Sequence, residues 1–158
     1  MITERLTAGV LFPLFFGDSK PVENPVRDGQ REGSDRSRKI KVIVIDDEPV
    51  IADTVVEILN GEGFEAMAVS TGASAVELAK AFDPDVVLSD VIMPGLNGIE
   101  TGIQIRKVAP QCRVILFSGQ AATVDLLEKA RQEGHRFDIL AKPIRPEQLI
   151  SVIRERSR

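Results

Sequence analysis

The chain lacks most of the residues that mark disulfide-rich or membrane-spanning proteins. Its 158 residues include one cysteine, one histidine, no tryptophan and no tyrosine. The single cysteine, Cys112, excludes an internal disulfide framework and fits a reducing compartment. No apolar run approaches the roughly 20 residues that are needed to cross a membrane. The sequence therefore predicts a cytoplasmic protein with no membrane contact.

An excess of positive charge is also missing. The 20 Lys and Arg residues are outnumbered by 24 Asp and Glu residues, so the net charge of −4 does not favour non-specific binding to nucleic acid. Neither end of the chain carries a helix-turn-helix or basic module, and no DNA-binding domain is expected. No glycine-rich turn follows the first apolar run, which argues against a nucleotide-binding domain.

The N-terminal segment differs in composition from the rest of the chain. Residues 18–39 (DSKPVENPVRDGQREGSDRSRK) are rich in Pro, Gly, Ser and mixed charge, which predicts a disordered tail or linker over 1–39. Residues 8–16 (AGVLFPLFF) could be read as a signal peptide. Against this, Pro13 interrupts the apolar patch and no small-residue cleavage site follows, so a mis-assigned start codon or a docking segment is favoured. Residues 40–158 are expected to form one domain.

Patterns typical of strands and helices alternate along that domain. Short apolar runs rich in Val and Ile predict strands buried on both faces. Prolines suited to the first turn begin two of the helical segments, and glycines follow several of them. Five strand–helix units predict an α/β fold with a doubly wound, five-stranded parallel sheet. The predicted strands cover 41–46, 65–69, 85–89, 113–117 and 137–141, and the predicted helices cover 49–60, 72–82, 98–108, 121–133 and 146–156.

Polar residues stand at the C-terminal ends of four of these apolar runs. The carboxyl ends of parallel strands meet at one edge of a sheet, where ligands of open α/β sheets bind. Three carboxylates, one hydroxyl and one ammonium group are therefore expected in one small volume. They belong to Asp46 and Asp47 (KVIVIDD), Asp90 (DVVLSD), Ser118 (RVILFSG) and Lys142 (FDILAKP).

The carboxylates of Asp46, Asp47 and Asp90 would repel one another if all were ionised and close. Such a cluster usually carries a cation, or one of its groups takes up a proton. Oxygen ligands with no His or Cys nearby favour Mg²⁺. The alternative is that Asp46 and Asp47 only cap the helix that follows them. Capping explains Asp90 poorly, because a loop separates it from the next predicted helix.

Lys142 and Ser118 complete the expected site. A lysine at the end of a buried strand is placed to meet an anion, and the bond before Pro143 has a raised chance of being cis. The Ser118 hydroxyl, next to the small Gly119, can donate to a phosphoryl oxygen. The alternatives are a solvated lysine at the rim and a serine that caps the next helix. Together the polar residues predict a pocket for a divalent cation and a phosphoryl group.

Residues 40–156 resemble the receiver domain of bacterial two-component response regulators. The motifs that carry the resemblance are VIVIDDEP (42–49), VVLSDVIMPGLNGIE (86–100), VILFSG (114–119) and ILAKP (139–143). The resemblance implies a CheY-like, flavodoxin-like sheet with the strand order 2-1-3-4-5. It also implies a stand-alone phosphoprotein of the single-domain type in a phosphorelay.

The resemblance further implies a role for each site residue. The chain would take a phosphoryl group from a sensor histidine kinase or a histidine phosphotransfer protein and would then bind a separate output protein. It would catalyse only its own phosphorylation and dephosphorylation, and it could form a homodimer through the fourth helix, fifth strand and fifth helix of the fold. The implied roles are phosphoacceptor for Asp90, Mg²⁺ binding for Asp46, Asp47, Asp90 and the backbone carbonyl of Ile92, and phosphoryl contact for Ser118 and Lys142.

Four further positions bear on signalling and on the lifetime of the phosphoryl group. Ile139 stands where the family often has an aromatic switch residue, so the Ser118–Ile139 pair would form the switch unless Phe137, on the same side of the strand, substitutes. The resemblance also implies that Ile92 and Gln120, two residues beyond the phosphoacceptor and the switch hydroxyl, flank the path of the hydrolytic water. Bulky Ile92 predicts a phosphoaspartate of moderate to long lifetime. It also argues against a phosphohydrolase of the haloacid-dehalogenase type, which needs a second Asp at that position.

Overall fold

A computed structural model describes residues 38–119 and 121–155 of the chain. The disordered tail was predicted over residues 1–39, of which residues 1–37 lie outside the described residues. The strands are β1 (Lys41–Ile45), β2 (Glu65–Val69), β3 (Val86–Asp90), β4 (Arg113–Ser118) and β5 (Asp138–Ala141). The helices are α2 (Pro49–Gly61), α3 (Gly72–Phe82), α4 (Gly98–Val108), α5 (Ala122–Gln132) and α6 (Pro146–Glu155).

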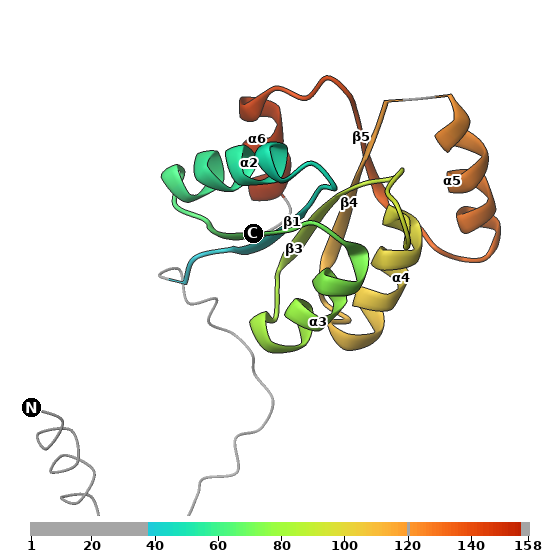
Figure 1. The fold of residues 1–158 in the computed structure, drawn as a ribbon, viewed down its shortest axis with the longest axis horizontal. Helices are drawn as coiled ribbons and strands as arrows, with labels where there is room; N and C mark the ends of the chain where they lie inside the picture. The colour runs from blue at the N-terminus through green and yellow to red at the C-terminus, as the bar shows by residue number, and fades with distance from the viewer. Residues whose placement is uncertain (1–37, 120, 156–158) are drawn as a thin grey trace, which may run out of the picture. The chain divides into compact units, whose positions relative to one another are not determined.

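The strands form one parallel sheet in the order β2-β1-β3-β4-β5, which confirms the predicted fold and strand order. Helices α2 and α6 cover one face of the sheet, and α3, α4 and α5 cover the other (Figure 1). None of the helices in the described residues is both long and apolar enough to cross a bilayer.

The core has two sides because neighbouring side chains of a strand point to opposite faces. In β1, Val42 and Val44 pack with the side chains of α2 and α6, whereas Ile43 and Ile45 pack with those of α3 and α4. Strand β4 divides in the same way, and its Leu116 packs on the side of α4 and α5. Burial of the central strands on both faces explains why their sequences are continuous apolar runs.

The element boundaries agree with the sequence to within about two residues, as expected for helix and strand ends. The informative difference is at the carboxyl ends of β3 and β4, which extend to Asp90 and Ser118. Asp90 pairs with Phe117, and Ser118 pairs with Ala141. Backbone pairing therefore holds both polar residues at the sheet edge.

Local capping sets where three of the helices begin. The Thr71 side chain accepts a hydrogen bond from the backbone N–H of Ser74 at the start of α3, and Asn97 and Glu100 form a capping box at the start of α4. Pro49 lies in the first turn of α2. Helix α5 differs, because it follows Ala121 and has no side-chain cap.

Candidate functional site

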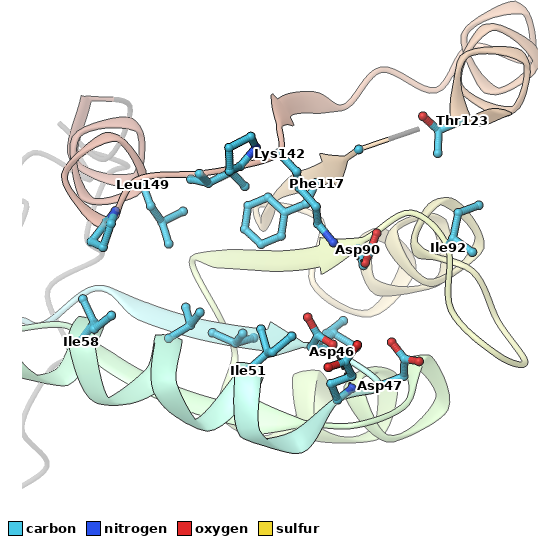
Figure 2. A pocket seen from close by; sticks show the side chains of 18 residues that line it. Asp46, Asp47, Ile51, Ile58, Asp90, Ile92, Phe117, Thr123, Lys142 and Leu149 are labelled. Carbon is cyan, nitrogen blue, oxygen red and sulfur yellow. Dashed lines mark hydrogen bonds and ion pairs between the residues drawn. The ribbon is translucent and has the colours of Figure 1, made fainter. Parts of the chain in front are cut away.

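The predicted site residues lie around one cavity at the carboxyl edge of the sheet. The cavity has a volume of about 840 Å³ and extends between α2 and α6 (Figure 2). Asp46, Asp47, Asp90 and Lys142 line its polar end, as the sequence predicted. Its remaining lining is largely apolar and comes from β1, β4, α2 and α6, including Ile51, Ile58, Phe117 and Leu149.

The two acidic residues after β1 differ in exposure. Asp46 is almost fully buried, and its Oδ1 accepts a hydrogen bond of 2.9 Å from the backbone N–H of Glu48. Asp47 is exposed. The N-cap position of α2 is Glu48 and has no side-chain cap, so neither aspartate is the helix cap that the alternative reading required. Their carboxylates remain on the cavity wall.

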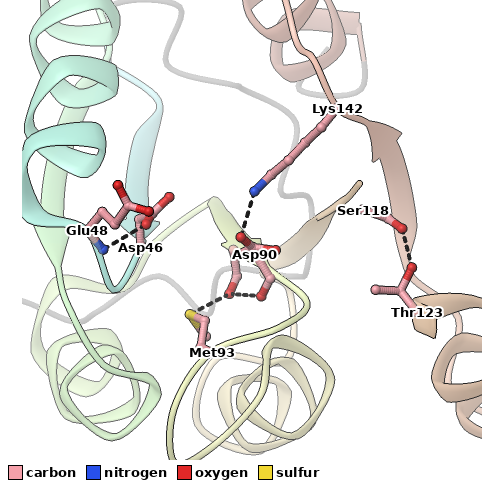
Figure 3. Close-up of polar contacts among 8 residues, drawn as sticks. Asp46, Glu48, Asp90, Met93, Ser118, Thr123 and Lys142 are labelled. Atoms are coloured by element: carbon pink, nitrogen blue, oxygen red, sulfur yellow. Dashed lines mark hydrogen bonds and ion pairs between the residues drawn. The ribbon is translucent and has the colours of Figure 1, made fainter. Parts of the chain in front are cut away.

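Asp90 and Lys142 form an ion pair at the centre of the site. Nζ of Lys142 lies 2.6 Å from Oδ2 of Asp90, and the Asp90 side chain is 19% exposed (Figure 3). A Cβ at Gly119 would lie 3.3 Å from Cδ of Lys142, so the glycine leaves room for the lysine stem. The Lys142–Pro143 peptide bond is cis, as the sequence suggested. The lysine that was predicted to meet an anion thus already contacts the carboxylate of Asp90.

A second glycine fits against the backbone of Asp90. A Cβ at Gly98 would lie 2.1 Å from the carbonyl oxygen of Asp90, a distance that no real side chain tolerates. The N–H of Gly98 also donates a 2.9 Å hydrogen bond to the carbonyl of Val91. The start of α4 therefore packs directly on the end of β3. This contact fixes the position of the backbone that carries Asp90.

The Ser118 side chain lies apart from the other site residues. Its hydroxyl forms a hydrogen bond with the Thr123 hydroxyl in the first turn of α5, and it is directed away from Asp90 (Figure 3). Ser118 is not among the described residues that line the cavity, whereas Thr123 is. Ser118 is also not the cap of α5, since Ala121 holds that position. Sequence reasoning missed Thr123, although a threonine in the first turn of the helix after β4 could have drawn attention to it.

The residues that were predicted to relay the signal, Ile139 and Phe137, each have a partner other than Ser118. Ile139 pairs with Leu116 in the sheet, two residues before Ser118, and is 42% exposed. Phe137 precedes β5 and packs against Gly102 of α4, with the Arg106 guanidinium 4.4 Å from its ring centre. Phe137 therefore lies toward the opposite end of the sheet from Ser118. Gln120 lies outside the described residues.

The carboxylates around the cavity are the candidate ligands of the predicted Mg²⁺. Asp46, Asp47 and Asp90 line one cavity and supply only oxygen donors, which suits this cation. Within residues 38–119 and 121–155, no group of three His, Cys, Asp or Glu side chains is drawn together as a metal centre. Asp90 is instead turned to Lys142. The residues fit the cation in kind, and Ile92, which is 46% exposed, lines the same cavity.

Carboxylates and a lysine gather at the carboxyl edge of this five-stranded parallel sheet, an arrangement that fits a receiver domain of signalling proteins. Residues 42–154 match the family described as the response regulator receiver domain. The chain belongs to this receiver family.

Relatives of known name agree with this assignment. The chain is 29% identical to chemotaxis protein CheY of Thermotoga maritima, over 75% of this chain and 98% of CheY. It is also 29% identical to the DNA-binding response regulator MtrA of Mycolicibacterium smegmatis, over 75% of this chain and 50% of MtrA. The chain thus spans about half the length of the MtrA proteins that it matches.

Solved structures agree as well. A response regulator receiver domain protein from Clostridium thermocellum superposes with a TM-score of 0.66 and 30% identity, covering 73% of this chain and 92% of that one. The chemotaxis protein CheY4 of Vibrio cholerae superposes with the same TM-score of 0.66 at 24% identity, which supports the fold alone.

Proposed function

We propose that Asp90 accepts a phosphoryl group from a phosphohistidine of a sensor kinase or of a histidine phosphotransfer protein. The observation that carries the proposal is the Asp90 carboxylate, held by Lys142 at 2.6 Å on the wall of an acidic cavity. A carboxylate oxygen of Asp90 attacks phosphorus, the P–N bond breaks, and the leaving imidazole takes up a proton. Water later cleaves the acyl phosphate, which releases inorganic phosphate and restores the carboxylate.

Asp46, Asp47, Asp90 and the backbone carbonyl of Ile92 are the groups proposed to hold Mg²⁺. When bound, the cation supplies positive charge that offsets the charge of the acceptor and of the arriving phosphoryl group. Lys142 contacts the Asp90 carboxylate, and its ammonium group would pair with a phosphoryl oxygen once Asp90 is phosphorylated. The chain's own residues thus mainly position the reacting groups and neutralise charge, as phosphoryl transfer requires.

The phosphoryl group is proposed to act as a switch for a partner protein. Phosphorylation adds charge and strong acceptors, which can bias a two-state element. Exposed apolar side chains on α5 and β5, namely Val124, Leu126 and Ile139, support a surface for a separate output protein or a second copy of the chain. We propose that phosphorylation and partner binding take place in the cytoplasm. We also propose that the chain acts on no substrate other than its own Asp90.

The test uses the full chain with Mg²⁺ and acetyl phosphate, or with a phosphorylated kinase. Wild type is expected to gain an acid-stable, base-labile phosphoryl adduct, and Asp90→Asn is expected to gain none. Asp53→Asn is a matched control, because Asp53 is an exposed aspartate on α2. Equal labelling of Asp90→Asn and wild type, or no labelling of wild type, would contradict the proposal.

A further inference from the structure

We propose that Thr123 holds the Ser118 hydroxyl in its resting position and thereby couples phosphorylation of Asp90 to the start of α5. The inference rests on the proposed function, because a phosphoryl group on Asp90 is what offers the Ser118 hydroxyl a competing partner. It assigns Thr123 as a positioning residue and identifies the structural element that responds first.

The backbone of Ser118 is fixed, so its hydroxyl can move only by rotation of the side chain. Ser118 is the last residue of β4 and pairs with Ala141. Its carbonyl also accepts a 2.9 Å hydrogen bond from the N–H of Lys142. Side chains rotate between discrete staggered positions. In the present position the hydroxyl meets Thr123 and is directed away from Asp90 (Figure 3).

Thr123 is well placed to hold this hydroxyl and to respond when it leaves. It is the second residue of α5, is 1% exposed, and lines the cavity that contains Asp90. The start of α5 has no side-chain cap, in contrast to the starts of α3 and α4. The Ser118–Thr123 hydrogen bond is therefore a side-chain contact that ties the beginning of α5 to the edge of the sheet.

A phosphoryl group on Asp90 would outcompete Thr123 for Ser118. Hydrogen bonds to a charged acceptor are roughly twice as strong as those between neutral groups. Thr123 would then lose its hydrogen bond to Ser118 in a buried position, and we expect its surroundings to adjust to this loss. Of the α5 side chains that the structure describes, Thr123 and Ala130 are buried, so the helix is lightly anchored. The adjustment is expected in its first turn, beside the exposed Val124.

This route does not need the aromatic residue that is missing from β5. Ile139 is half-exposed and is paired with Leu116, while Phe137 is packed on Gly102 away from Ser118. Thr123, in contrast, contacts the hydroxyl directly. The structure therefore provides a contact from Ser118 through Thr123 to α5, which a phosphoryl group on Asp90 would engage by drawing away the Ser118 hydroxyl.

The test is the affinity of the full chain for beryllofluoride, a phosphoryl analogue, in the presence of Mg²⁺. Thr123→Val keeps the shape of the side chain and removes the resting partner of Ser118. We expect this variant to bind about 2- to 12-fold more tightly than wild type, the range of one neutral hydrogen bond. Thr123→Ser restores the hydroxyl and should restore wild-type affinity. In a Ser118→Ala background, Thr123→Val should have no further effect.

Thr54→Val is the matched control for loss of a threonine hydroxyl. Oγ1 of Thr54 donates a 2.7 Å hydrogen bond to the carbonyl of Val50 within α2 and does not touch Ser118. Its affinity for beryllofluoride should equal that of wild type. Affinity of Thr123→Val equal to or weaker than that of wild type would overturn the role of Thr123.

A second measurement tests the coupling between Ser118 and the start of α5 even if Thr123→Val does not fold. Hydrogen exchange of the backbone amides of residues 122–126 should accelerate when beryllofluoride binds wild type, and should not change in Ser118→Ala. Unchanged exchange in wild type would overturn the proposed coupling while leaving phosphorylation of Asp90 intact. Failure of wild type both to bind beryllofluoride and to gain a phosphoryl group would instead overturn the proposed function, and this inference with it.

Discussion

Nζ of Lys142 and Oδ2 of Asp90 lie 2.6 Å apart, although 52 positions separate the two residues in the sequence. The contact joins the end of β5 to the end of β3 across β4. It places the positive charge of the lysine beside the carboxylate that we propose as phosphoacceptor. The pair thus defines the centre of the site.

Lys142→Met should affect phosphoryl binding much more than stability. The lysine side chain is 41% exposed, and an exposed ion pair contributes at most about 1 kcal/mol to the free energy of unfolding. A hydrogen bond to a charged group is worth about 1.5–3 kcal/mol, so beryllofluoride should bind at least about 10-fold more weakly. Lys80→Met, which removes the exposed Lys80–Glu77 pair, is the control and should bind normally. Tight binding by Lys142→Met would exclude the proposed role.

Gly98→Ala should destabilise the protein and slow phosphorylation of Asp90. The added Cβ would lie 2.1 Å from the carbonyl oxygen of Asp90, so β3 and α4 must move apart. Overpacking of this kind costs about 1–3 kcal/mol of the free energy of unfolding, which urea denaturation measures. Gly61→Ala is the matched control, because a Cβ there meets nothing within 4 Å. Equal stabilities of the two variants would show that the β3–α4 contact is loose.

Ile92→Asn should shorten the lifetime of the phosphoaspartate. Ile92 lies on the cavity wall, where we expect its apolar side chain to keep water from the proposed acyl phosphate. An amide can instead bind and orient water, and one such hydrogen bond would accelerate hydrolysis by about 2- to 10-fold. The decay of labelled phosphoprotein measures this rate, and Val108→Asn, at an exposed apolar position on α4, is the control. A wild-type half-life of seconds would refute the expectation of a moderate to long lifetime.

The thiol of Cys112 should be inert in the folded protein. Burial raises the pKa of this thiol to about 12, and the negative charge of Asp85 adds to the effect. Because Cys112 is the single cysteine, its reaction with a thiol reagent at pH 8 reports unfolding directly. Labelling should be slow in buffer and fast in urea. Rapid labelling of the folded chain would show that the site opens locally.

The same thiol should contribute a pH dependence to stability. The folded state keeps the Cys112 proton above the ordinary thiol pKa of 9.0, where the unfolded state loses it. Stability linked to this group is therefore complete below pH 9.0 and is lost as the pH rises toward about 12. Urea denaturation of wild type and Cys112→Ala across this range should show a steeper loss for wild type. Parallel curves would contradict a raised pKa.

The sequence by itself determined the fold and most of the site. Continuous β-branched runs that alternate with helical patterns favour central strands buried between two layers of helices, which implied the parallel sheet. A parallel sheet brings the carboxyl ends of its strands to one edge, so Asp46, Asp47, Asp90 and Lys142 could be grouped before any contact was known. Both inferences depend on backbone geometry, which repeats from one protein to another.

Only the tertiary structure decided what each side chain touches. Ser118 was placed correctly at the sheet edge, but its hydroxyl meets Thr123 of α5 and does not face Asp90. The packing of Phe137 on Gly102 was likewise beyond the sequence pattern. A rotamer is selected by the neighbours that surround it, and those neighbours come from distant parts of the chain. Strand periodicity sets the face of a residue, while packing between elements sets its partner.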